Sequence, residues 1–227
     1  MARSSPTSTR ALAPRLPASL QDGVDATLDD DEEWNELALR GDWSGQEADD
    51  AEIVACTFAG ARLTGVRLER VRITDTVFTS CELSGAMFES GVLTRVAFHD
   101  CRMSGFVASR AQLRDVVFDQ CRLDVANFRM ATGERVELDH CDLTSAELMN
   151  AKITRLRLTD CDLSRTELSQ AQLPGVRLHG SKLDLVKGAM SLKGAVIGSE
   201  QIYPLSLRLF DALKIVIDDE PEPDDEH

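Results

Sequence analysis

The chain has few aromatic residues, only four histidines and no long apolar run. Aromatic side chains make up 5% of its 227 residues, although hydrophobic residues reach 43%. No stretch approaches the roughly 20 consecutive apolar residues that a membrane-spanning helix needs, so we expect no membrane contact. A hydrophobic content made mostly of small and aliphatic residues predicts a narrow interior rather than a broad one.

The first twenty residues lack the apolar segment of a secretory signal peptide. They contain three arginines and no acidic residue, which fits either an organelle transit peptide or a disordered tail. We expect residues 1–28 to be a disordered tail. Six cysteines without a secretory signal favour a reducing compartment, so the sequence predicts a cytoplasmic protein with free thiols.

The net charge of −14 is concentrated at the two ends of the chain. Residues 1–50 hold twelve acidic and four basic residues, and residues 200–227 hold nine acidic and two basic ones. The segment between them has 18 acidic and 19 basic residues. We expect residues 218–227 to be a disordered acidic tail, and a chain this acidic is not expected to bind nucleic acid.

A five-residue repeat dominates the centre of the sequence. From residue 51 to residue 185 the chain divides without a gap into 27 units of five residues. The third residue of nearly every unit is Leu, Phe, Ile or Met, and the first is small or β-branched. This period matches neither an α-helix nor a plain strand. Two inward-facing residues in every five can build a four-sided coil of about twenty residues.

A twenty-residue period is visible independently of the five-residue frame. Two series of residues recur at that spacing, as first and third residues of their units: Cys81, Cys101, Cys121, Cys141 and Cys161; Phe58, Phe78, Phe98 and Phe118. Two units depart from the pattern. Phe106 is first and Ala108 third in one unit, which preserves the packed volume. Gly133 is third in another, where we expect a small void or a local bend.

Units such as CDLTS, CDLSR, AQLRD and ANFRM read roughly as A(D/N)LXX. On these units the chain resembles the pentapeptide-repeat family over residues 51–185. The resemblance implies an all-β fold, a right-handed quadrilateral β-helix. We expect this β-helix over residues 51–198, with short helical caps at its amino and carboxyl ends.

The amino-terminal cap is expected within residues 29–50, as a helix followed by a first turn. Acidic residues 29–33 suit a helix start, Trp34, Leu37 and Ala38 have helical spacing, and Gly41 suits a helix end. The sequence GDWSG is already in the repeat frame, so Trp43 is expected in the first coil.

The carboxyl-terminal cap is expected over residues 199–217. Ser199 is placed as the helix N-cap and Pro204 near the helix start. An apolar stripe follows: Leu205, Leu209, Phe210 and Leu213. The stripe either closes the rod or contacts a second copy of the chain. In relatives of this family a carboxyl-terminal helix often makes a twofold dimer, so the resemblance keeps a homodimer through this cap as one of the two alternatives.

No residues are predicted to be catalytic, cofactor-binding or metal-binding, and the chain is not expected to be an enzyme. The cysteine series is collinear and faces inward, whereas zinc needs four converging ligands. His99, His140 and His179 lie near acidic residues on the phenylalanine side, where a divalent cation could bridge a pair. No closed ligand set, nucleophile or Gly-rich phosphate loop accompanies them.

The outward positions of the phenylalanine side carry the negative charge of the repeat. Its acidic residues are either ordinary surface or a stripe that docks a basic partner. The candidate partner-binding residues are Asp100, Asp119, Glu137, Asp139 and Asp160.

Two functions follow from the sequence. One is a non-catalytic scaffold that binds a protein through the flat sides of the solenoid. The other is implied by resemblance to the loop-free, fluoroquinolone-resistance branch of the family, namely a DNA-mimicking protein that binds DNA gyrase or topoisomerase IV. The nearly neutral repeat argues against the second, because duplex DNA carries one charge per ~1.7 Å.

Overall fold

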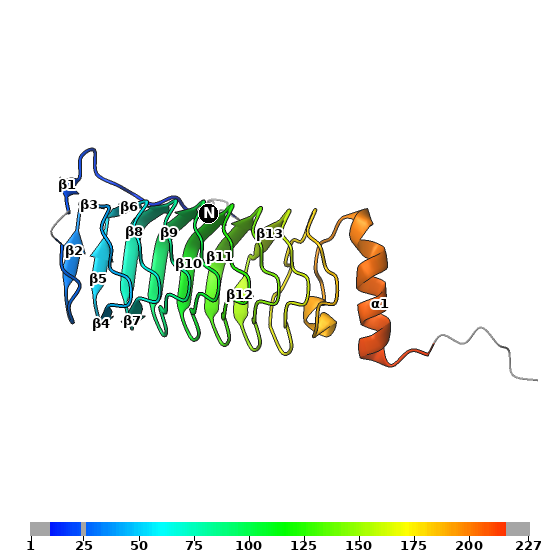
Figure 1. The fold of residues 1–227 in the computed structure, drawn as a ribbon. Helices are drawn as coiled ribbons and strands as arrows, with labels where there is room; N and C mark the ends of the chain where they lie inside the picture. Colours follow the sequence, from blue (N-terminus) through cyan, green and yellow to red (C-terminus); the bar gives the residue numbers. More distant parts are fainter. Residues whose placement is uncertain (1–9, 24–25, 217–227) are drawn as a thin grey trace, which may run out of the picture.

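The computed structural model describes residues 10–23 and 26–216 as one parallel β-solenoid of about seven turns, followed by a carboxyl-terminal helix (Figure 1). The expected all-β β-helix is confirmed. Four long strands form its middle: β8 (Arg72–Thr79), β9 (Val92–His99), β10 (Gln112–Asp119) and β11 (Thr132–Asp139). Each turns one corner and so contributes to two adjacent walls.

Shorter strands extend these two walls toward both ends. They are β1 (Gln21–Asp22), β2 (Glu33–Asn35), β3 (Leu37–Leu39), β5 (Glu52–Val54), β6 (Thr57–Ala59), β12 (Lys152–Thr154) and β13 (Arg157–Thr159). The other two walls are mostly turns joined by single bridges, apart from β4 (Glu47–Asp49) and β7 (Arg67–Glu69).

The register between successive coils is twenty residues. Phe78 lies opposite Phe98, and Phe98 lies opposite Phe118. Single bridges on the remaining walls keep the same spacing, as in Arg62 with Glu82. The predicted columns are therefore real columns of stacked side chains.

The corners form at the fifth residue of each unit, where the backbone adopts a left-handed conformation. Asp75 has φ of 51° and Ser80 has φ of 52°. Such angles are unfavourable for residues with a Cβ atom, and Asp is among the residues that tolerate them. Most corner amides of the repeat are hydrogen-bonded to the next coil, as in Ser80 N–H to the His99 carbonyl at 2.9 Å. The repeated hydrogen bond offsets the conformational cost.

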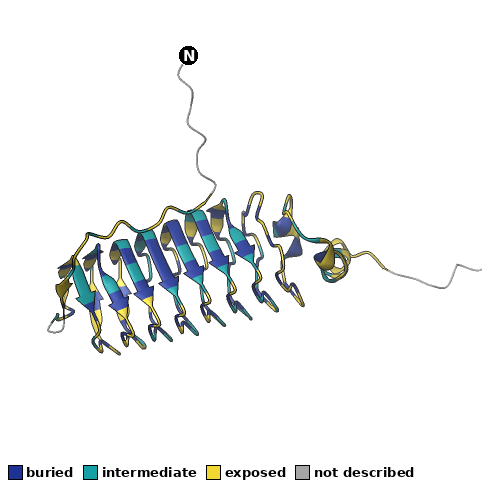
Figure 2. Cartoon of the chain, turned by 90° about the horizontal axis from the view of Figure 1, so that it is seen from above, coloured by how far each residue is buried: buried dark blue, intermediate teal, exposed yellow. Residues whose placement is uncertain are grey.

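The core is a single cluster of packed side chains, and Figure 2 shows that buried residues recur in coil after coil along the rod. The Phe58, Phe78, Phe98 and Phe118 rings stack with centroid separations of 4.4, 4.7 and 4.9 Å. The predicted exchange of Phe106 and Ala108 is confirmed, since both are fully buried and Phe106 meets Phe88 edge to face at 5.2 Å.

Gly133 does not bend the solenoid. It stays in β11, in register with Leu113 on one side and Ile153 on the other. An apolar void of about 20 Å³ lies inside this part of the rod and is lined by Leu113, Val136 and Ile153 among others. The lining of this void extends from Leu113 to Leu192 and does not include Gly133, where an added Cβ would lie 3.0 Å from the Leu113 carbonyl, so the void is not localised at the glycine. The alternative of a bend is wrong, because the backbone ladder holds its register without a side chain.

The expected amino-terminal cap helix is absent from the described residues. Residues 33–35 form β2 and residues 37–39 form β3 instead. Glu36, between the two strands, has a backbone angle φ of 57°, which is incompatible with a right-handed α-helix. Trp34 is in register with Ile53, 19 residues away, so this first coil is one residue shorter than the others. The pairing of β2 and β3 with the next coil satisfies the backbone N–H and C=O groups of that coil. A helix lying across the end would leave those groups without hydrogen bonds.

Two tryptophans close the amino-terminal end of the core. Trp34 and Trp43 are each 3% exposed, and their rings lie 5.2 Å apart. Their indole N–H groups donate to the carbonyls of Thr27 and Ala26 at 2.9 and 3.0 Å. The placement of Trp43 in the first coil is confirmed, because Asp42 bridges to Arg62 of the next coil.

The expectation of a disordered tail over residues 1–28 is wrong for most of that segment. Residues 10–20, which we call the arm, run back along one edge of the solenoid from β11 to β1 (Figures 1 and 2). Strand β1 then pairs with β3. Hydrogen bonds from the arm to acidic side chains of the solenoid, described below, give it a defined position. Residues 1–9 and the predicted tail at 218–227 lie outside the described residues.

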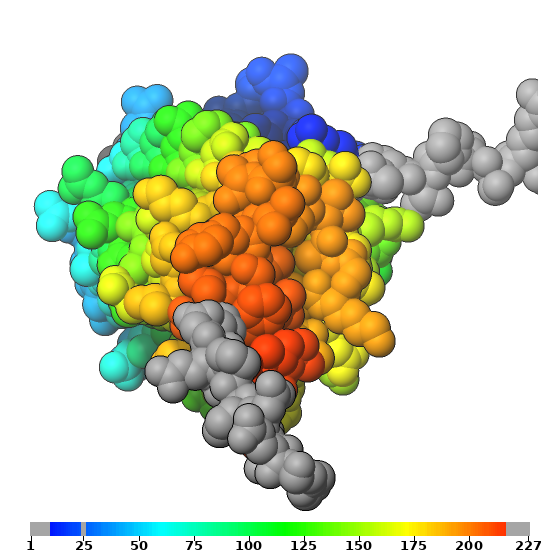
Figure 3. Space-filling view, turned by 90° about the vertical axis from the view of Figure 1, so that its right-hand side faces the viewer, coloured from blue at the N-terminus to red at the C-terminus, as the bar shows by residue number. Residues whose placement is uncertain are grey.

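The carboxyl-terminal cap is a helix that crosses the end of the rod (Figure 3). The 3-10 helices η1 (Ala189–Leu192) and η2 (Ser199–Gln201) precede α1 (Ile202–Leu213). Ser199 therefore starts a 3-10 turn and is not the N-cap of α1. The buried Gln201 side chain donates from Nε2 to the Leu178 and Ser181 carbonyls, which satisfies backbone groups at the open end.

No helix within the described ranges combines the length and apolar character that crossing a bilayer requires.

Candidate interaction surface

The wall built on the phenylalanine column carries most of the predicted site. We call it the phenylalanine wall; it consists of β6, the second halves of β8, β9, β10 and β11, and β13. Strand alternation directs the third residue of each unit inward and the second and fourth outward. Phe118 is thus buried, whereas Val117 and Asp119 lie on the outside.

Four of the five predicted acidic residues gather along one edge of this wall. Asp119 and Asp139 lie opposite each other in the register of β10 and β11. Asp100 and Asp160 occupy the adjacent corners, with φ of 52° and 51°. We call these four residues the acidic edge. Because adjacent coils are about 4.8 Å apart, the backbone itself sets the spacing of the carboxylates.

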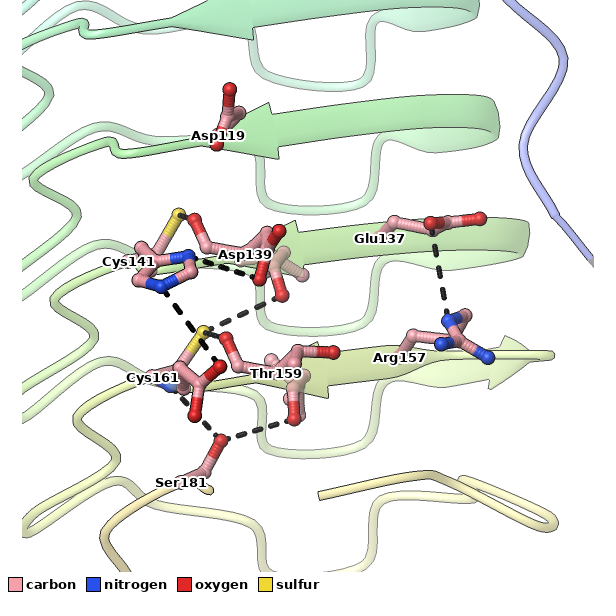
Figure 4. Close-up of polar contacts among 12 residues, drawn as sticks. Asp119, Glu137, Asp139, Cys141, Arg157, Thr159, Cys161 and Ser181 are labelled. Atoms are coloured by element: carbon pink, nitrogen blue, oxygen red, sulfur yellow. Dashed lines mark hydrogen bonds and ion pairs between the residues drawn. The ribbon is translucent and has the colours of Figure 1, made fainter. Parts of the chain in front are cut away.

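Two histidines interleave with the acidic edge. His99 Nδ1 lies 3.2 Å from Asp119 Oδ2, and His140 Nδ1 lies 3.2 Å from Asp139 Oδ1. His140 Nε2 is also 3.9 Å from Asp160 Oδ2 (Figure 4). These side chains are between 35% and 61% exposed. The edge is therefore a cluster of carboxylate–imidazole contacts that is open to solvent.

Asp139, His140 and Asp160 could together offer three ligand atoms to a cation, since those atoms lie within 4.8 Å of one another. All three side chains are half exposed or more, and they already pair with one another. The side chains contact one another in an exposed position, and we assign no metal to them.

Glu137 lies at the opposite edge of the wall, beside the arm (Figure 4). Its carboxylate accepts a hydrogen bond from the Ala11 N–H at 2.8 Å and pairs with Arg10 at 3.1 Å. The side chain is only 13% exposed. Sequence analysis placed Glu137 with the acidic edge, but the structure separates it from the other four residues and gives it a partner within the chain.

A ladder of ion pairs runs along the corner next to Glu137. Arg95 contacts Asp75 through Nε and Nη2, both at 2.6 Å, and Arg135 contacts Asp115 in the same way at 2.5 and 2.9 Å. The hydrogen bonds from Arg95 hold the pKa of Asp75 below its ordinary value. Burial alone would raise the pKa of Asp115, yet the hydrogen bonds from Arg135 keep it low.

The two aspartates of this ladder also bind the arm. Asp115 Oδ1 accepts the Leu12 N–H at 3.0 Å, and Asp75 Oδ1 accepts the Arg15 N–H at 2.9 Å. Sequence analysis did not single out Asp75 or Asp115. The available signal was the alternation of Asp and Arg at twenty-residue spacing, at positions 75, 95, 115 and 135.

The six cysteines are free and buried, as expected. Their thiols donate to backbone carbonyls, as in Cys121 Sγ to the Phe98 carbonyl at 3.4 Å. Burial raises the pKa of the Cys56 thiol, which disfavours the reactive thiolate. Ser181 continues the column at its carboxyl end and donates to the Leu158 carbonyl at 3.0 Å. These residues serve packing and backbone satisfaction.

The predicted stripe on α1 divides between two environments. Leu205 is 8% exposed and Leu209 is half-buried, and both pack against the core. Phe210 and Leu213 are 37% and 55% exposed. The first pair closes the rod, whereas the second pair leaves an apolar surface on the outside of the helix.

Sequence models of two kinds match the repeat. One, described as a pentapeptide repeat region, matches residues 51–128 and 92–158, and one described as pentapeptide repeats in eight copies matches residues 154–187. The chain belongs to the pentapeptide-repeat family. No curated protein matches this pentapeptide-repeat chain.

Solved structures of other pentapeptide-repeat proteins are similar at low identity. HetL, involved in heterocyst differentiation regulation in the cyanobacterium Nostoc sp. strain PCC 7120, is 17% identical with a TM-score of 0.38, over 74% of this chain and 87% of HetL. QnrB1 (M102R, trypsin treated), a plasmid-mediated fluoroquinolone resistance protein, is 20% identical with a TM-score of 0.39, over 89% of this chain and 100% of QnrB1. Rfr23 from the cyanobacterium Cyanothece 51142 is 12% identical with a TM-score of 0.21, over 75% and 91% of the two chains. At these identities the similarity concerns the fold alone.

Proposed function

We propose that this pentapeptide-repeat protein is a non-catalytic scaffold that binds a basic partner protein through the acidic edge. The observation that carries the proposal is the fixed spacing of Asp100, Asp119, Asp139 and Asp160 on two neighbouring columns of a rigid wall. A partner that docks there orders few additional side chains, because the register already positions the carboxylates. Six free, buried thiols suit a reducing compartment, and we place this function in the cytoplasm.

The experiment compares the full chain with a variant in which all four acidic-edge residues are changed to Lys. Proteins are captured from native lysate, and each captured protein is then purified and titrated directly. We expect an affinity that falls with rising salt and is lost in the variant, because exposed charges attract through a screened field.

A matched control reverses four carboxylates away from the acidic edge: Glu47, Glu52, Glu147 and Asp184. This control changes the net charge by the same amount. If it abolishes binding as completely as the first variant, the attraction depends on net charge and the acidic edge is not the docking site.

DNA gyrase or topoisomerase IV is a second candidate partner. The uninterrupted repeat resembles the loop-free fluoroquinolone-resistance branch, and the acidic edge supplies a negative stripe along the rod. Each column of that stripe offers at most one carboxylate per coil of about 4.8 Å, against one charge per ~1.7 Å of duplex DNA. A supercoiling assay tests it: purified protein should inhibit gyrase or protect it from a quinolone, and the acidic-edge variant should do neither. Unchanged supercoiling with micromolar wild-type protein removes this candidate.

We also propose that a second copy of the chain covers the outer face of α1. Tyr203, Phe210 and Leu213 are 73%, 37% and 55% exposed there, and apolar side chains in contact favour a closed pair. Sedimentation should give a dimer mass that Phe210→Glu with Leu213→Glu halves, whereas the neighbouring change Lys214→Glu preserves it. A wild-type monomer at micromolar concentration contradicts this proposal without affecting the acidic edge.

A further inference from the structure

The arm is held by a regular pattern of contacts. Its backbone amides at Leu12 and Arg15, three residues apart, donate to Asp115 and Asp75, which are two coils apart. One residue earlier, the Ala11 amide donates to Glu137 in the next coil toward the carboxyl end. The arm therefore runs opposite to the direction in which the coils advance.

The spacing of these contacts requires an extended conformation and excludes a helix, and it fits a polyproline II segment. Two coils advance about 9.6 Å at ~4.8 Å each, and three residues of a polyproline II helix advance about 9.3 Å at ~3.1 Å each. An α-helix would cover only about 4.5 Å in three residues. One turn of the arm, which is three residues in polyproline II, therefore has about the same length as two coils of the solenoid.

Burial along the arm shows the same period of three. The half-buried residues are Ala11, Pro14, Pro17 and Leu20, and those between them are exposed. Proline suits these positions because its φ fits the extended conformation and its missing N–H is not needed there. The composition of the arm thus agrees with the site it occupies.

The surface beside the ladder is adapted to such a segment. On the phenylalanine wall, the second-position residues next to Asp75 and Asp115 are Val77, Ala97 and Val117, a column that ends at Glu137. These side chains point outward, yet Ala97 is only 4% exposed and the two valines are half-buried. An apolar strip with the Asp75 and Asp115 carboxylates beside it, two coils apart, is a surface that suits an extended peptide with amide donors three residues apart.

We infer that Asp75, Asp115 and Glu137 form a binding site for polyproline-type peptide segments, and that the arm is its resident ligand. The partner that fits is a segment of another protein with small residues or proline at every third position. The arm competes with that segment because its tether gives it a high effective concentration. This inference is independent of the acidic edge, which lies along the other side of the wall.

The test uses a fluorescent peptide of residues 10–20 as the probe and the full chain as the receptor. Leu12→Pro with Arg15→Pro removes the two amide donors while keeping a φ that suits the arm. The control, Ala13→Pro with Leu16→Pro, makes the same change at two amides that donate no hydrogen bond within the described part of the chain. A circular dichroism spectrum of each variant checks that it retains the solenoid fold.

We expect the probe to bind the Leu12→Pro, Arg15→Pro variant at least tenfold more tightly than it binds the wild type or the control. Hydrogen bonds to charged groups are strong enough that losing two of them releases the arm. Hydrogen exchange of the wild-type chain should protect the amides of Leu12 and Arg15 but not those of Ala13 and Leu16. Equal probe affinity in all three proteins, or unprotected amides at Leu12 and Arg15, would overturn the inference.

Discussion

Replacing Phe98 by alanine should destabilise the solenoid more than any change on its surface. The Phe98 ring is fully buried and stacks between Phe78 and Phe118 at 4.7 and 4.9 Å, with interplanar angles of 12° and 5°. Truncating a buried Phe to Ala costs about 3–5 kcal/mol, and the upper part of that range applies where neighbours cannot collapse into the cavity. The twenty-residue register fixes both neighbouring coils, so we expect about 4–5 kcal/mol.

Phe98→Leu is the matched control, because the same column is occupied by Leu138 two coils later. The leucine fills most of the space and loses mainly the stacking with Phe78 and Phe118, a cost of about 1–2 kcal/mol. Guanidinium unfolding followed by circular dichroism measures both variants. The guanidinium concentration at the midpoint of unfolding should be lower for Phe98→Ala than for Phe98→Leu by roughly 0.5–1 M. If the two variants unfold at the same concentration, the ring column is not packed as described.

Three further predictions concern the ends and the ladder. Leu205→Ala should lower the free energy of unfolding by about 2–3 kcal/mol, whereas Leu213→Ala should change it by less than about 0.5 kcal/mol, because only the first side chain is buried; thermal unfolding measures both. Asp115→Ala should cost about 2–3 kcal/mol in the same assay, since the Arg135 guanidinium, 12% exposed, loses its two hydrogen bonds to Asp115 and keeps its contact with Glu134, and a cost below about 1 kcal/mol would contradict the pairing. The pKa of Asp75 is lowered in the folded chain, so the contribution of its carboxylate to the stability of the fold is complete above its ordinary pKa of about 4 and is lost as the pH falls through the lower folded value. Hydrogen exchange at the Arg15 amide, which donates to Asp75, should therefore accelerate relative to its intrinsic rate only below about pH 4.

The coils could be predicted from sequence because their inward residues repeat without interruption. A frame set by Leu, Phe and Ile at every fifth position determines which side chains stack, and the cysteine and phenylalanine columns follow from it. The same frame continues upstream of residue 51, but with one residue missing. Trp34, Leu39, Trp43 and Ala48 are buried at spacings of five, four and five, and the shortened step resembles the spacing of a helix.

The candidate site could be predicted only in part. Asp100, Asp119, Asp139 and Asp160 share an edge because their columns are adjacent, which the frame predicts. Glu137 is in the same wall but at its other edge, and its partner comes from a segment 126 residues away. Six of the eleven residues of the arm are Ala or Leu, but they do not follow the five-residue frame of the coils. The order of the arm depends on acceptors in distant coils, which composition alone does not reveal.

The shared period of the arm and the ladder constrains how this rod could change in length. Duplicating one coil between Asp75 and Asp115 would leave every wall intact, since each coil stacks on its neighbour in the same way. The acceptors would then stand three coils apart, about 14 Å, while the step of three residues from Leu12 to Arg15 spans only about 9 Å. A duplication beyond Glu137 would leave the arm undisturbed. The arm thus fixes the number of coils between its contact residues, and coils can be added without disturbing the arm only beyond Glu137.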